Sequence, residues 1–408
     1  MSHQPSWRLN HPVPAAPHHR HQTSLEDVVD MSSITLDPLA PPVRQAARQT
    51  FYRVVEYFEA IDPHLNNARD QRVTTYSQPR LVRFTYEYAL SDNSRDVFLR
   101  AFFGSMALAM DSDAALDFQE LAPRFAGFAE YLMDYFFLPL KASTRKTPQP
   151  SPAYRSAFLF AQGGSATGEY VMTPDRLSTL RGACLVRDRH RCVISRKFHV
   201  AEFKRRLKQH GREARDDDGA LLIEQQGQFD ILEVAHILPH SLMKADAGAG
   251  TDAARQAALS ILNMFDTGVT HMIDGVDIDR PRNALTLTTS LHADFGAFEI
   301  YFDPVLDQNN TYRIQSFTDP EMNVLLGLPL PVTRTLFLTE DHTIEPPSPR
   351  LLAIHRAIAH ILHLSGAGEY IERVLYDMED SVVRADGTSE LGRMVRLGLS
   401  GWVDGAVC

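Results

Sequence analysis

The amino-acid sequence predicts an α+β protein in which a small strand–strand–helix unit lies between two mainly helical regions. Two short apolar segments, 233–238 and 284–287, are rich in β-forming residues and have polar residues at their ends. Long stretches on both sides repeat apolar residues every three or four positions, as amphipathic helices do. We expect a disordered tail (1–40), a helical region (41–140), a linker (141–175), a central α+β domain (176–318) and a C-terminal helical region (319–408).

The N-terminal part alternates between breaker-rich and helical segments. Proline and histidine dominate the first 40 residues, which favours disorder. Pro41-Pro42 begins a helix that continues to Ile61, where Pro63 ends it. Residues 73–90 fit a strand or a helix, and helices are expected after Asp92-Asn-Ser94 and over 114–137. Serine and proline then give 141–152 the composition of a linker.

Composition limits the classes of function. With 408 residues, 44% hydrophobic and 23% charged, the chain has the make-up of a soluble globular protein of two or three domains. The net charge of -10 means that any nucleic-acid-binding surface must be local. Three cysteines provide no disulfide framework, which favours a reducing compartment, either nucleus or cytoplasm. No apolar run is long enough for a membrane span or a secretory signal, so no membrane partner is expected.

One stretch of the chain is strongly basic, from Arg181 to Arg215. Arginine and lysine dominate contacts with phosphate backbones, although a solvated helix face has the same composition. The candidate nucleic-acid-binding residues in this stretch are Arg187, Arg189, Arg191, Arg196 and Lys197. A zinc site at Cys192 is not supported, because Ser195 stands where a second cysteine is needed.

The central unit carries the residues with chemical potential. Val234 and Ile237 flank His236 in the first strand, and Pro239 ends it. Asn283 precedes the second strand, and Ser290 is expected to cap a following helical turn that bears His292. A helix over 251–265 is inserted between the strands, with Met264-Phe265 expected to pack against this unit. His236, Asn283 and His292 are therefore expected to converge.

This order of motifs resembles the HNH endonuclease superfamily, the ββα-metal nucleases, and more narrowly the HNH domain of many uncharacterised fungal proteins. The resemblance covers about residues 181–304, and no single tripeptide carries it. The matching segments are Arg191-Cys-Val-Ile-Ser195, Ala235-His-Ile-Leu-Pro239, Met264-Phe-Asp266, Asp279-Arg-Pro-Arg-Asn283, Leu291-His-Ala-Asp-Phe-Gly-Ala-Phe298 and Glu299-Ile-Tyr-Phe302.

The resemblance implies a ββα-metal core and a nuclease that uses one divalent metal ion (Mg, Mn, Ni or Zn) on nucleic acid, with DNA preferred. His236 matches the general base that activates water, and Asn283 the asparagine that ties down the loop between the strands. His292 matches the metal ligand on the helix. Neutral imidazole suits a base near neutral pH, while a cation stabilises charge on the phosphate.

One departure from the family pattern concerns the position before the base. Many members carry an aspartate or histidine there as a second metal ligand, but this chain has Ala235. Glu233 is expected on the same strand face as Ala235 and is expected to reach the metal only with distortion. The other candidates for the second metal ligand are His240, His271 and Asp294. The alternative function is therefore a catalytically reduced HNH module that binds nucleic acid or a partner protein without cleavage.

The C-terminal part is expected to begin with a hairpin and continue as helices. Segments 298–302 and 312–317 alternate as paired strands do, joined by a turn at Asp307-Gln-Asn-Asn310. Ser348-Pro349 opens a helix to about Leu364, and a second helix covers 369–380. The histidines of the first helix lack the glutamate of a zinc-protease motif.

Overall fold

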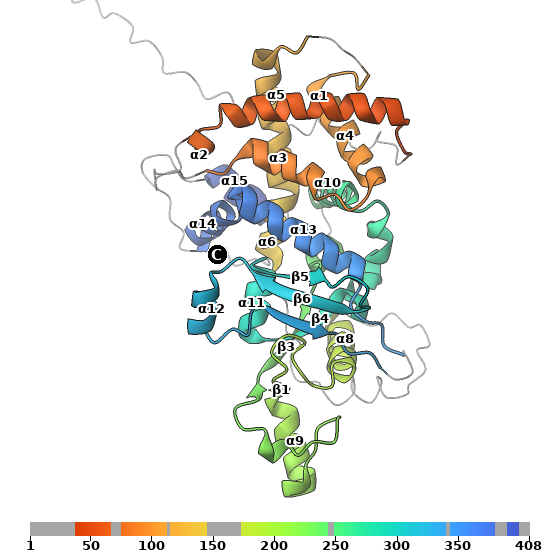
Figure 1. Ribbon diagram of the computed structural model, residues 1–408, viewed down its shortest axis with the longest axis vertical. Coiled ribbons are helices and arrows are strands. Elements are labelled where there is room, and N and C mark those ends of the chain that lie inside the picture. The colour runs from red at the N-terminus through yellow and green to blue at the C-terminus, as the bar shows by residue number, and fades with distance from the viewer. Residues whose placement is uncertain are drawn as a thin grey trace, which may run out of the picture.

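The computed structural model describes residues 37–66, 75–111, 115–144, 173–243, 249–339, 343–379 and 390–399. Figure 1 shows the N-terminal helices at one end of an elongated molecule, the C-terminal helices beside them, and small sheets toward the other end. The mixture of helices with short strands agrees with the predicted α+β class. A single apolar cluster runs from Leu39 to Leu397, so the regions share one core.

Helices make up the described N-terminal region. They are α1 (Pro41–Ala60), α2 (Pro63–Asn66), α3 (Gln78–Glu87), α4 (Asp92–Met106), α5 (Phe118–Leu132), the π-helical segment η2 (Met133–Phe137) and α6 (Leu138–Thr144). The segment that fitted either a strand or a helix contains the helix α3, which the Ser77 side chain caps and whose apolar face is buried. Phe51 packs edge-on against Phe98 and Phe102, with ring centroids 5.6 and 5.1 Å away.

Both ends of this region extend beyond the predicted bounds. Leu39, assigned to the tail, is buried, and its amide donates to the Asp96 carboxylate at 2.8 Å. Lys141 and Thr144, assigned to the linker, lie buried in α6, where the Lys141 ammonium pairs with Glu372 at 2.9 Å. The rest of the predicted tail and most of the linker lie outside the described residues. The apolar positions Leu39 and Leu140 explain why both segments join the core.

The central region contains two short sheets. The parallel pair β1 (Phe198–His199) and β2 (Phe229–Asp230) lies beside α9 (Val200–His210). The antiparallel pair β3 (Leu232–His236) and β4 (Ala284–Thr288) is flanked by α8 (Thr173–Arg187) and α11 (Thr289–Gly296). Between β3 and β4 lie η5 (His240–Met243), α10 (Ala249–Phe265), η6 (Val269–Met272), η7 (Gly275–Asp279) and η8 (Pro281–Asn283).

One local expectation about this region is wrong, and one contact was not expected. The cap of α11 is Thr288, whose hydroxyl accepts from the Leu291 amide at 3.4 Å, and Ser290 lies inside the helix. The Phe265 ring at the end of α10 stacks on Phe136 at a centroid distance of 5.3 Å. Phe265 therefore contacts the aromatic side chains of the N-terminal helices, within one apolar cluster that also contains Leu285 and Leu287 of β4.

The C-terminal region contains a three-stranded antiparallel sheet followed by helices. The order is β5 (Ile300–Pro304), β6 (Thr311–Ser316) and β7 (Val332–Thr335), with α12 (Pro320–Leu325) between the last two strands. The first two strands confirm the expected hairpin, while β7 was not expected. The helices are α13 (Pro349–Ser365), α14 (Ala367–Glu379) and α15 (Leu391–Leu399). Within the described part of the chain, no helix has the length and apolar content to span a membrane.

Candidate HNH site

The two faces of β3 carry different chemistry. Side chains alternate along a strand, so Val234 and His236 project to one face, and Glu233 and Ala235 to the other. On the first face, Val234 packs with Ala284 and with Leu180 and Cys184 of α8. On the second face, Glu233 meets α11. We call these the α8 face and the α11 face.

On the α8 face, His236 belongs to a buried polar cluster. Its Nε2 lies 3.1 Å from Oδ1 of Asp279, and Nδ1 of His240 lies 2.9 Å from the same oxygen. The Arg176 guanidinium approaches the other carboxylate oxygen at 3.6 Å. Burial alone would raise the pKa of Asp279, but the hydrogen bonds from His236 and His240 outweigh it and hold that pKa well below its usual range. Asp279 is therefore ionised at neutral pH.

The second nitrogen of His236 is arranged differently. Nδ1 is buried and has no hydrogen-bond partner among the described residues. Because an ionised Asp279 only accepts hydrogen bonds, Nε2 carries the imidazole proton and donates it to Oδ1. Nδ1 then presents a lone pair, which is the form that a general base requires.

Asn283 braces the turn that follows His236. Its side chain is fully buried, and its Oδ1 accepts from the Leu238 amide at 2.9 Å. Its Nδ2 donates to the carbonyls of Leu238 and Ile278, each at 2.9 Å, while its own carbonyl accepts from the Ile237 amide at 2.8 Å. Asn283 thus ties the end of β3 to the segment that ends in Asp279, so one residue fixes the positions of both His236 and Asp279.

On the α11 face, His292 pairs with a carboxylate. Its Nδ1 lies 2.7 Å from Oε2 of Glu233, and the two side chains are 10% and 22% exposed. Glu233 reaches His292 from a regular strand, so the distortion expected for it is not needed. The far end of α11 is held by His355, whose Nε2 donates to the Phe295 carbonyl at 3.0 Å.

The comparisons with known proteins bear on this arrangement. Residues 192–303 match the sequence model of a family described as HNH endonuclease. This segment is similar to the HNH endonuclease family, and we call it the HNH segment. Searches of curated proteins and of solved structures give no match to the chain. The matched range contains β3, β4 and α11 with His236, Asn283 and His292, and it lies within the range in which the resemblance was expected.

The structure does not bring all the predicted HNH residues to one point. Among the described residues, the group of three side chains that could hold a metal is His236, His240 and Asp279. His292 lies with Glu233 on the other face, so His236 and His292 do not share a cluster of ligands. Of the other suggested ligands, the described geometry places His240 in the group but not His271 or Asp294. The roles of His236, Asn283 and His292 stay predictions.

Asp279 is the residue that sequence reasoning missed. It was quoted as part of the motif that ends at Asn283, but it was given no role. The available signal was its position four residues before Asn283, on the same inter-strand segment. Sequence alone does not show that η7 folds back against the end of β3, which the hydrogen bonds of Asn283 bring about.

The predicted nucleic-acid contact of Arg187 is wrong. Its side chain is 0% exposed, and both carboxylate oxygens of Asp188 accept from its guanidinium at 2.8 Å. The remaining donor positions bond to the carbonyls of Pro281 and Ala284 at 2.7 and 2.9 Å. Arg187 therefore holds the start of β4 against α8, and no phosphate reaches it in this arrangement.

The other four candidate nucleic-acid-binding residues also have protein partners. Arg189 pairs with Asp218, Arg191 with Asp216 at 2.6 Å, and Lys197 with Asp230 at 2.9 Å. Burial, helped by the neighbouring Arg334, lowers the pKa of Arg196 to about 10. Nucleic-acid binding by these four residues stays a prediction, and Arg189 and Lys197 are the more exposed of them. Cys184 and Cys192 lie buried in different apolar clusters.

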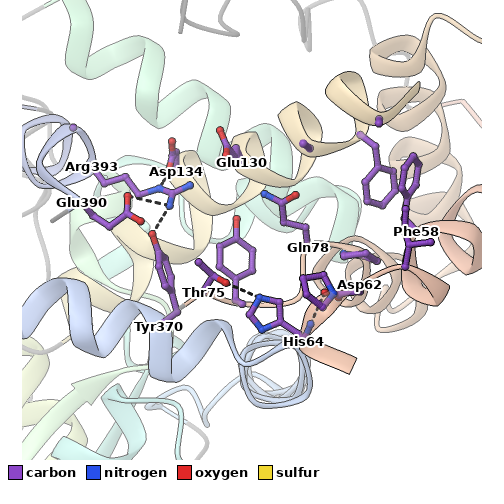
Figure 2. Close-up of a pocket in the computed structure, with 18 of the residues that line it drawn as sticks. Phe58, Asp62, His64, Thr75, Gln78, Glu130, Asp134, Tyr370, Glu390 and Arg393 are labelled. Carbon is purple, nitrogen blue, oxygen red and sulfur yellow. Dashed lines mark hydrogen bonds and ion pairs between the residues drawn. The ribbon is translucent and has the colours of Figure 1, made fainter. Parts of the chain in front are cut away.

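A cavity of about 690 Å³ lies away from the HNH segment, between the N-terminal helices and α15. Figure 2 shows its lining, in which Arg393 points toward Asp134 and Tyr370. The Arg393 Nε donates to Asp134 at 2.6 Å, which fixes α15 against η2. None of the predicted site residues lines this cavity, so it is not the nuclease site.

Proposed function

We propose that this protein is a metal-dependent nuclease that hydrolyses phosphodiester bonds of nucleic acid, with DNA as the first substrate to test. The observation that supports it best is the state of His236 within the HNH segment. One imidazole nitrogen donates to a buried carboxylate, and the other presents an unpartnered lone pair. Such an arrangement is suited to removing a proton from water.

Each residue of the α8 face has a separate role in this proposal. Nδ1 of His236 takes a proton from the attacking water, which makes the ring an imidazolium. The Asp279 carboxylate stabilises that cation and keeps the ring oriented, as the third group of a catalytic triad does. Asn283 is a positioning residue that acts through the backbone on either side of it.

The α11 face supplies suitable ligands for the divalent cation that the family uses. Glu233 offers a carboxylate oxygen and His292 an imidazole nitrogen, 2.7 Å apart and partly exposed. Two protein ligands suit a cation that keeps several waters and binds substrate phosphate. When bound, the cation stabilises charge on the phosphate and on the leaving oxygen. Glu233 thus replaces the carboxylate that is missing at Ala235.

Access to the base sets a condition on catalysis. His236 is 7% exposed, and the Nδ1 atom is buried. A phosphate therefore meets Nδ1 only after the residues that cover this atom move. The same burial favours the alternative function, a reduced HNH module that binds nucleic acid or a partner protein without cutting, as does Ala235.

Cleavage assays with metal separate these two functions. Purified protein is incubated with plasmid, single-stranded DNA and RNA in Mg²⁺, Mn²⁺, Ni²⁺ or Zn²⁺. We expect cleavage with at least one of these metals, and we expect it to be lost in His236→Ala and in His292→Ala. His271→Ala is the matched control, because this exposed histidine lies outside both faces. A folded protein that shifts DNA in a gel and never cuts it would contradict the nuclease and support the alternative.

A further inference from the structure

Three metal-binding atoms meet on the α8 face, away from the His292 pair. They are Nε2 of His236, Nδ1 of His240 and a carboxylate oxygen of Asp279, all within 4.8 Å of one another. Both nitrogens lie close to Oδ1, at 3.1 and 2.9 Å. His240 comes from η5 and Asp279 from η7, so three separate elements supply one ligand each.

The spacing of these atoms suits a small transition-metal ion. In a tetrahedral zinc site with bonds of about 2.0–2.1 Å, ligand atoms lie roughly 3.3 Å apart. The two distances in the cluster need to widen by only a few tenths of an ångström to reach that value. Two imidazoles with one carboxylate are a donor set for zinc, whereas magnesium and calcium prefer all-oxygen sites.

A second observation points to a missing ligand at this cluster. The Asp279 side chain is 3% exposed, and its Oδ2 is buried without a hydrogen-bond partner among the described residues. A buried carboxylate oxygen without a hydrogen bond can still take up a donor or a cation, although the Arg176 guanidinium partly offsets its charge. Arg176 is the charged group that faces this oxygen from α8, at 3.6 Å, and its charge reduces the affinity for a cation without filling the ligand position.

We infer that His236, His240 and Asp279 bind a zinc-class ion, and that this binding switches off the base. The inhibitory part rests on the proposed nuclease. A neutral imidazole carries one proton, and the hydrogen bond to the Asp279 carboxylate favours Nε2 as its position. A metal on Nε2 requires that proton to be on Nδ1, so the lone pair that would accept a proton from water is lost. The ion is distinct from the cation that Glu233 and His292 would hold.

Zinc binding to the full-length protein tests the site without any cleavage assay. Titration against a chromogenic zinc chelator gives the number and affinity of bound ions. We expect His240→Ala to lose one zinc equivalent or to weaken it by about tenfold or more, while His292→Ala keeps that equivalent. His240→Gln, which preserves more of the side-chain volume, should behave like His240→Ala. Circular dichroism confirms that each variant is folded.

The outcomes separate the site from the proposed function. If His240→Ala and wild-type protein bind zinc equally, the site is wrong, whatever the nuclease assay shows. If zinc binds and Mg²⁺-supported cleavage falls over the same zinc concentrations, both parts are supported. If zinc binds and cleavage continues unchanged, the inhibitory part is overturned. If the protein never cleaves, the proposed nuclease fails, and the binding titration still decides the metal site.

Discussion

The two faces of β3 hold two histidines in contrasting surroundings. On the α8 face, His236 shares the buried, ionised Asp279 with His240. On the α11 face, His292 meets Glu233 at a partly exposed position. Both are histidine–carboxylate pairs, but the side chains of His236 and Asp279 are each 3% exposed, against 10% and 22% for His292 and Glu233. Residue type alone therefore does not show which histidine suits the role of general base and which suits the role of metal ligand. Burial and the hydrogen bonds of each imidazole decide this.

The sharpest test of the α8 face is Asp279→Asn. The amide cannot stabilise the imidazolium that forms on His236, so we expect the cleavage rate to fall by about 10²-fold or more. The acid limb of the kcat/KM profile should also move to lower pH, which a merely structural role would not cause. Asp277→Asn is the matched control, since Asp277 lies in the same η7 element and pairs with Arg282 at 2.8 Å. Equal activity of both variants would remove Asp279 from the mechanism.

The corresponding test of the α11 face is Glu233→Gln. The substitution keeps the size of the side chain and removes the charged oxygen, so we expect Mg²⁺ or Mn²⁺ affinity to fall by about 10- to 100-fold. Saturating metal should restore most of kcat, in contrast to Asp279→Asn. The metal dependence of cleavage and calorimetric titration measure the two effects. A variant with unchanged metal affinity would show that Glu233 only orients His292.

A fall in pH should destabilise the structure around α11 before it affects the α8 face. Burial lowers the pKa of His355 to about 3, and its ring stacks on Phe295 of α11 at 3.9 Å. The unfolded chain takes up this proton below about pH 6.5, so stability is complete above that pH and falls by about 2 kcal/mol at pH 5. Asp279, with its lowered pKa, stays ionised over this range.

Denaturation at pH 7.5 and pH 5 measures this effect. His355→Leu should be less stable at pH 7.5, but its free energy of unfolding should change less between the two pH values than that of wild-type protein. Hydrogen exchange should show α11 loosening before the turn braced by Asn283. Identical pH dependence in the variant and wild-type protein would exclude His355 as the source.

The smallest expected effect concerns the basic stretch. Lys197 is 40% exposed and pairs with Asp230 at 2.9 Å. Lys197→Ala should weaken DNA binding slightly and reduce the slope of log affinity against log salt by about 1. Lys208→Ala on α9 controls for general charge, and gel-shift titrations over a range of salt give the slopes. An unchanged slope would place the phosphate path elsewhere.

Sequence periodicity was sufficient for most of the long helices and for the order of β3, β4 and α11, but it left α3 open between strand and helix. The short strand β7 (Val332–Thr335) was missed because Arg334 and two threonines give it no apolar alternation. Burial was the harder property: Arg187 belongs to a basic run, and only the carbonyls of Pro281 and Ala284 show that it faces inward. The pairing of His236 with Asp279 depends on the fold of a 3₁₀ segment, for which residue spacing carries little information.

The insertion helix α10 has a consequence for how this protein can be taken apart. It lies in the segment that connects β3 to β4, and its Phe265 ring stacks on Phe136 among the N-terminal helices. The HNH segment therefore packs against the N-terminal helices through a helix inserted between its own two strands. A fragment of residues 192–303 would expose the Phe265 ring to solvent and would lose Arg187, which bonds to the Ala284 carbonyl. A truncated protein that keeps β3 and β4 folded therefore needs the N-terminal helices as well.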